Sequence, residues 1–135
     1  MAGYSGTPLV QKLGMKAGHR VALLNAPDGF VDALDPPDDC AVTASLRGRA
    51  PIDVVVLFVT SAAQLTKRFG VARRRIAKDG GLWVGWPKRS SGVPTDLDGN
   101  AVRAFGLSEG LVDNKVCAID ETWSGLRFVW RREDR

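Results

Sequence analysis

The segment 86–96, WPKRSSGVPTD, gathers side chains that are suited to holding an anion. Lys88 and Arg89 bring positive charge, and Ser90 and Ser91 bring hydroxyl groups. The glycine that follows lets backbone amides turn toward a bound oxygen. A phosphate, sulfate or carboxylate is therefore a predicted ligand of this loop. Its glycine spacing matches no phosphate-loop motif, so an ordinary solvated turn stays open as the alternative.

Polar and aromatic side chains also follow the other apolar runs of the chain. Asn25 ends one run, Thr60 follows another, and Glu121 follows a third. In an open parallel sheet the carboxyl ends of the strands share one edge, and ligands bind there. An indole ring at such an edge can stack on a flat ligand. The predicted ligand-binding residues are Asn25, Asp28, Gly29, Thr60, Ser61, Trp86, Lys88, Arg89, Ser90, Ser91, Glu121 and Trp123.

Catalytic and metal-binding patterns are missing from the sequence. His19 is the only histidine, so a Ser-His-Asp triad or a histidine metal site would depend on it alone. Cys40 and Cys117 have no metal-ligand spacing and are expected to be buried free thiols. Asp120 and Glu121 would point to opposite faces of a strand, which disfavours a shared-proton dyad. We assign no catalytic residue and no metal ligand, and we leave the cofactor unknown.

Length and composition indicate one globular domain covering residues 1–135. No apolar run approaches the roughly 20 residues of a membrane helix. The first residues lack a signal-peptide pattern, so we expect a cytoplasmic protein that does not contact a membrane. The net charge of +4 is mildly basic. An acidic segment at residues 28–39 borders the same edge as the basic loop, which disfavours nucleic acid as a partner.

Hydrophobic periodicity predicts strands and helices in alternation. The clearest buried strand is DVVVLFV at residues 53–59. A capping box at Ser61 begins a basic helix, Thr95 is expected to cap the next helix, and residues 79–81 are expected to form a turn. The expected strands are 20–25, 40–46, 53–59, 82–86, 112–120 and 126–131, and the expected helices are 7–14, 30–34, 61–76 and 95–105.

Alternating strands and helices are typical of an α/β protein with helices on both faces of a parallel sheet. The last two strands follow each other without a helix, which predicts a terminal hairpin with one antiparallel edge strand. Arg127 and Arg131 are suited to protecting such an edge from unwanted pairing. The predicted fold is a single-domain, Rossmann-like three-layer fold with a mostly parallel sheet that ends in an antiparallel hairpin.

The order of these segments resembles the Rossmann-like fold of S-adenosylmethionine-dependent methyltransferases. The strand GHRVALLN, the long middle strand, the basic helix, DGGLWV and the final hairpin carry the resemblance. It implies a Gly-x-Gly cofactor loop after the first strand and an acidic residue at the end of the second strand, where it holds a ribose. In this chain residues 25–29 read NAPDG, and residues 44–46 read ASL.

A second resemblance is closer and spans nearly the whole chain. The segments GYSGTPLVQKLG, HRVALLNAP, LFVTS, WPKRSSGVPTDL and VDNKVCAIDETWSGLRFVWR are similar to those of a family of small bacterial proteins of unknown function. This resemblance implies a single cytoplasmic domain and brings no catalytic residues.

Three functions stay open on these residues. The main hypothesis is a non-catalytic domain that binds an anionic small molecule at the carboxyl edge of the sheet. The first alternative is a protein-interaction module, such as a homodimer formed through the C-terminal hairpin. The second alternative is a divergent S-adenosylmethionine-dependent methyltransferase.

Overall fold

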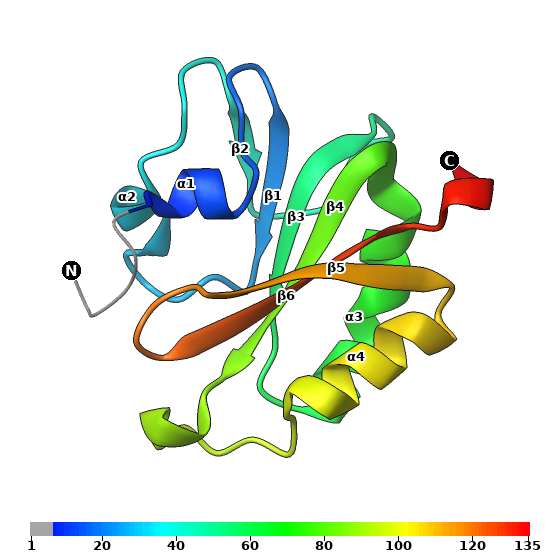
Figure 1. The fold of residues 1–135 in the computed structure, drawn as a ribbon. Helices are drawn as coiled ribbons and strands as arrows, with labels where there is room; N and C mark the ends of the chain where they lie inside the picture. The colour runs from blue at the N-terminus through cyan, green and yellow to red at the C-terminus, as the bar shows by residue number, and fades with distance from the viewer. Residues whose placement is uncertain (1–6) are drawn as a thin grey trace.

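The computed structural model describes residues 7–135, so residues 3–6 of the segment GYSGTPLVQKLG lie outside it. Strands and helices alternate along the chain as expected (Figure 1). None of the helices in this described part is long and apolar enough to cross a membrane. The elements are α1 (Leu9–Lys12), β1 (Arg20–Leu24), α2 (Phe30–Leu34), β2 (Ala41–Thr43), β3 (Ile52–Phe58), α3 (Ala62–Arg75), β4 (Ile76–Pro87), η1 (Arg89–Ser91), α4 (Gly99–Ser108), β5 (Leu111–Ala118), β6 (Trp123–Trp130) and η2 (Arg132–Asp134).

The strands form one six-stranded sheet in the order β2-β1-β3-β4-β6-β5. Strands β1 to β4 pair in parallel, and β6 is antiparallel to both β4 and β5. This arrangement confirms the predicted α/β class and the Rossmann-like sheet with an antiparallel end. One detail of the prediction is wrong, because β6 lies inside the sheet and β5 forms the edge. The crossover through α4 places β5 one position outward, and β6 returns to fill the gap, so Arg127 cannot protect an edge.

Two hydrophobic cores lie on opposite faces of the sheet (Figure 1). Helices α3 and α4 cover one face, where Phe69 meets Phe105 and Phe128 edge-on with ring centroids 5.2 and 5.7 Å apart. Helices α1 and α2 lie on the other face, where Phe30 packs against Phe58 with centroids 4.9 Å apart. Burial on both faces explains the unbroken apolar runs of the central strands.

Helix α3 begins with the predicted capping box. The Ser61 hydroxyl accepts a hydrogen bond from the Gln64 amide at 3.2 Å, and Gln64 Oε1 accepts one from the Thr60 amide at 2.8 Å. These bonds satisfy amides that a helix start would otherwise leave without partners. The box also fixes the point where the chain leaves β3 at the carboxyl edge.

The predicted cap of α4 is wrong. The helix begins at Gly99 because the Asp98 carboxylate, not Thr95, accepts the Ala101 amide at 2.8 Å. An ionised carboxylate is a stronger acceptor for a helix amide than a hydroxyl. The Thr95 hydroxyl instead accepts the Leu97 amide at 3.1 Å in the preceding turn.

Residues 79–81 do not form the predicted turn, because they belong to β4, where its register with β3 shifts. Their two glycines let neighbouring groups approach the backbone closely, and they do not reverse the chain direction. A Cβ at Gly80 would lie 2.7 Å from the Asp53 carbonyl oxygen, and one at Gly81 would lie 2.4 Å from Arg127 Nε. Only glycine therefore fits these two positions without a shift of the neighbours.

Both cysteines are free and half-buried. Burial raises the pKa of the Cys117 thiol, although Lys12, Lys115 and Lys88 each act to lower it. Since the thiolate is the reactive form, we expect folded Cys40→Ser protein, which retains Cys117 alone, to react with iodoacetamide several-fold more slowly than free cysteine at neutral pH. Urea-unfolded protein provides the control and should react like free cysteine. A folded-state rate equal to that of free cysteine would contradict the expectation.

Candidate functional site

Five strands, β1 to β5, end at one edge of the sheet. Strands β1, β3 and β4 are parallel, and β5 runs in the same direction because both β4 and β5 are antiparallel to β6. Two cavities open at this carboxyl edge. One lies over the ends of β1 and β2, and the other lies between the end of β4 and the start of α4. We name them the β1–β2 cavity and the β4–α4 cavity.

The β1–β2 cavity has a volume of about 570 Å³, which is within the usual range of small-molecule sites. Two left-handed residues shape the loop that borders it, Asn25 with φ 57° and Gly29 with φ 78°. Asn25 Nδ2 also donates to the Phe58 carbonyl at 3.4 Å, which ties the loop to β3. The loop therefore leaves β1 at a fixed angle and keeps the space beside the strand end open.

The charge in the β1–β2 cavity is entirely negative. Asp28 and Asp32 line it, and among residues 7–135 no lysine, arginine or histidine does. Thr43, at the end of β2, also lines the cavity, and its hydroxyl donates to the Ser45 carbonyl at 2.9 Å. A site with this lining attracts cationic ligands and repels phosphates and carboxylates.

The β4–α4 cavity also has a volume of about 570 Å³, and its lining charges balance. Lys88 and Arg89 contribute two positive charges, and Asp96 and Asp98 contribute two negative ones. Both carboxylates are held in place by helix starts, because each accepts a backbone amide at 2.8 Å, one in α3 and one in α4. Trp86 lines the cavity while only 7% of its surface is exposed. The anion-binding charge predicted for this loop is thus offset by its own downstream acids.

The predicted ligand-binding residues divide between the two cavities instead of forming one site. Asn25, Asp28 and Gly29 line the β1–β2 cavity. Trp86, Lys88 and Arg89 line the β4–α4 cavity. The predicted residues that line neither cavity are Thr60, Ser61, Ser90, Ser91, Glu121 and Trp123.

Several of these remaining residues have structural contacts. The Ser91 hydroxyl donates to the Lys88 carbonyl at 2.7 Å and stabilises the η1 turn. The Trp123 ring packs edge-on against Phe58 with centroids 5.1 Å apart. Glu121 is exposed to solvent. Their proposed ligand contacts stay a prediction.

Sequence reasoning missed Asp32 and Thr43 in one cavity and Asp96 and Asp98 in the other. A signal for Thr43 was present, because it ends β2, but the strand was expected to run three residues further. Asp32 belongs to the acidic segment, which looks like solvated surface in the sequence. Within residues 7–135 no group of three or more potential ligands is placed to hold a metal ion.

The comparisons with known proteins identify the fold. No family model and no curated protein matches the chain. A SAM-dependent methyltransferase from Aquifex aeolicus matches with a TM-score of 0.63 and 14% identity, over 89% of this chain and 86% of that one. The fibrillarin pre-rRNA processing protein of Methanococcus jannaschii matches with a TM-score of 0.62 and 13% identity, over 95% and 70%. A ribosomal protein L11 methylase from Lactobacillus delbrueckii subsp. bulgaricus gives 0.60 and 11%, over 92% and 75%. The chain thus has a methyltransferase-like Rossmann-like architecture.

Proposed function

We propose that this chain is a divergent cytoplasmic methyltransferase, with S-adenosylmethionine bound in the β1–β2 cavity and a methyl acceptor bound in the β4–α4 cavity. The observation that carries the proposal is the acid-lined cavity at the carboxyl ends of β1 and β2 in a sheet of this type. Ligands of open α/β sheets bind near the point where the strand order reverses, which here is between β1 and β3, and the β1–β2 cavity lies on the β1 side of that point. This hypothesis replaces the earlier main hypothesis of a non-catalytic domain that binds an anionic small molecule.

Charge complementarity supports the cofactor. S-adenosylmethionine carries a sulfonium and an ammonium group against a single carboxylate, so it is a net cation. Asp28 and Asp32 give the β1–β2 cavity the opposite charge, and no cation of the described residues offsets them in the lining. A phosphate-bearing nucleotide would meet repulsion at the same place.

The shape and donor set of the cavity also fit the cofactor. Ala26, Pro27 and Val42 offer apolar surface for an adenine ring, and carboxylate oxygens accept hydrogen bonds from ribose hydroxyls. The Gly-x-Gly pattern is missing, but a Cβ added at Gly29 would meet no atom within 4 Å, so the backbone there is open to a ligand. The residues present therefore fit S-adenosylmethionine.

Bound S-adenosylmethionine supplies an electrophilic methyl group, and the chain would supply binding and orientation. The end of β3, with Thr60 beyond it, lies between the strands that border the two cavities. The balanced charges of the β4–α4 cavity suit a polar acceptor that carries both donors and acceptors. Orientation of two bound reactants is itself a large source of rate enhancement.

Isothermal titration with S-adenosylmethionine and S-adenosylhomocysteine tests the proposal. The wild type should bind both. An Asp28→Asn/Asp32→Asn variant should bind S-adenosylmethionine roughly five- to tenfold more weakly, because two exposed charge interactions are lost. Its affinity for S-adenosylhomocysteine, which lacks the sulfonium, should fall less.

The matched control is Asp38→Asn/Asp39→Asn, which removes two exposed acids of the same segment that do not line this cavity. It should bind both ligands like the wild type. The proposal fails if the wild type binds neither ligand, or if the control loses as much affinity as the cavity variant.

A further inference from the structure

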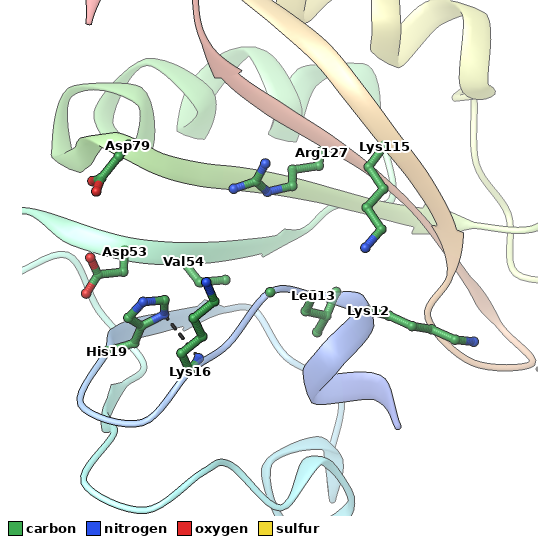
Figure 2. Close-up of a pocket in the computed structure, with 10 residues that line it drawn as sticks. Lys12, Leu13, Lys16, His19, Asp53, Val54, Asp79, Lys115 and Arg127 are labelled. Carbon is green, nitrogen blue, oxygen red and sulfur yellow. Dashed lines mark hydrogen bonds between the residues drawn. The ribbon is translucent and has the colours of Figure 1, made fainter. Parts of the chain in front are cut away.

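A third cavity lies toward the amino ends of the parallel strands, away from the carboxyl edge. It has a volume of about 330 Å³ and is bordered by the end of α1, the segment before β1 and the strands β3 to β6 (Figure 2). Leu13 and Val54, both buried, line its apolar part. Asp53, near the start of β3, and Asp79, in the amino-terminal part of β4, mark its position. We name it the α1–β6 cavity.

The lining of the α1–β6 cavity is positively charged, unlike the linings of the two cavities at the carboxyl edge. Four cationic side chains line it against two carboxylates, which leaves an excess of two positive charges. By the same count the β1–β2 cavity has two negative charges in excess and the β4–α4 cavity has none. Figure 2 shows the charged ends of Lys16, Lys115 and Arg127 directed into the space, whereas Lys12 points away from it.

The two carboxylates of this cavity offset only part of the positive charge in its lining. Asp53 Oδ2 accepts the Arg20 amide at 2.8 Å, which holds it at the start of β1. Asp79 is exposed to solvent. Within residues 7–135 no carboxylate lies within ion-pair distance of Arg127. The half-buried guanidinium therefore has no anionic partner among the described residues.

Arg127 is positioned by the backbone of β4. Its guanidinium lies against Gly81, where a Cβ would come within 2.4 Å of Nε, and Nη1 donates to Asn114 Oδ1 at 3.4 Å. Burial lowers the pKa of Arg127, and the positive charge of Arg135 lowers it further. A smaller hollow of about 200 Å³ continues past Arg127 and is lined by Lys78 and Arg135, which add to the positive field.

We propose that the α1–β6 cavity binds a phosphate monoester through Arg127, Lys115 and Lys16. A guanidinium fixed by its surroundings offers paired N–H donors to phosphate oxygens, and ammonium groups add charge. The cavity has more room than an inorganic phosphate fills, so the organic part of an ester can occupy the remaining space. The site is independent of the proposed methyl-transfer function, since it uses the opposite edge of the sheet.

Isothermal titration of the full chain with glycerol 3-phosphate and with inorganic phosphate tests this site. Glycerol 3-phosphate should bind in the millimolar range or tighter, and inorganic phosphate more weakly. Lys115→Gln, at an exposed position, should lower the affinity about fivefold, as expected for loss of a charge-assisted bond. Arg127→Lys keeps the charge but loses the paired donors, and should weaken binding at least as much.

The matched control is Lys67→Gln, which removes an exposed cation of α3 that does not line the cavity. It should bind glycerol 3-phosphate like the wild type, and so should Asp28→Asn/Asp32→Asn, which separates this proposal from the methyltransferase one. Thermal melting checks that each variant is folded. The proposal is overturned if glycerol 3-phosphate does not bind, if Lys67→Gln loses as much affinity as Lys115→Gln, or if inorganic phosphate binds as tightly as the ester.

Discussion

Gly106→Ala should destabilise the protein by about 2–3 kcal/mol, although alanine is the better helix former. Gly106 is buried in α4, and a Cβ there would lie 2.0 Å from Phe128 Cε1 and 2.4 Å from Cζ. The Phe128 ring is fully buried and packs edge-on against Phe69, so it has no free space to move into. Overpacking therefore outweighs the roughly 1 kcal/mol that alanine contributes in a helix interior. Urea denaturation monitored by circular dichroism measures the change.

Gly70→Ala is the matched control and should have the opposite sign. Gly70 also lies inside a helix, but a Cβ there would meet only Arg74 Nη1, at an ordinary 3.7 Å. The substitution should stabilise the protein by about 0.5–1 kcal/mol through helix propensity alone. If both substitutions change the free energy of unfolding in the same direction, the contact with Phe128 does not determine how well α4 tolerates alanine.

The secondary structure was largely predictable because local signals determine it. The run DVVVLFV became β3, and the Ser61 capping box began α3. The failures involve partners that are distant in sequence. Gly80 and Gly81 were expected in a turn, yet they make room for the Asp53 carbonyl and the Arg127 side chain. A glycine pair looks the same in the sequence whether it forms a turn or makes room for a neighbouring group, so only the tertiary contacts distinguish the two cases.

The edge of the sheet that holds the candidate site could be predicted from the sequence, but the two separate cavities at that edge could not. Strand ends placed Asn25, Asp28 and Lys88 at one edge, as the parallel topology requires. Their separation into two cavities depends on the width of the sheet, which the sequence does not express. The chain after Lys88 returns so that Asp96 and Asp98 share its cavity, which offsets the charge that suggested an anion.

The α1–β6 cavity escaped sequence analysis for a topological reason. Lys16 precedes β1, Lys115 lies on β5 and Arg127 lies on β6, so nothing in their spacing relates them. They meet because β6 inserts between β4 and β5, which places Arg127 against Gly81. Because β6 lies inside the sheet and not at its edge, Arg127 lines a cavity instead of an exposed sheet edge.

Trp83→Phe should destabilise the protein by about 3 kcal/mol, because it removes a buried hydrogen bond and leaves a small void. Trp83 is completely buried, and its Nε1 donates to the Leu13 carbonyl at 3.0 Å, which joins the end of α1 to β4. Trp130→Phe is the matched control. Its Nε1 donates to the Ile76 carbonyl at 3.4 Å from a half-buried ring, so its loss should cost about 1 kcal/mol or less. Urea midpoints should order the three proteins as wild type, Trp130→Phe, Trp83→Phe.

The same bond has a consequence for the α1–β6 cavity, because Leu13 lines that cavity. Trp83→Phe removes no charge, yet release of the α1 end should weaken glycerol 3-phosphate binding several-fold while S-adenosylmethionine binding at the opposite edge stays unchanged. Trp130→Phe should leave both affinities at the wild-type value. If Trp83→Phe matches the wild type in stability and in phosphate-ester affinity, then the indole bond does not hold α1 in place. In that case the wall of the cavity depends on the packing of α1 and not on its anchor to β4.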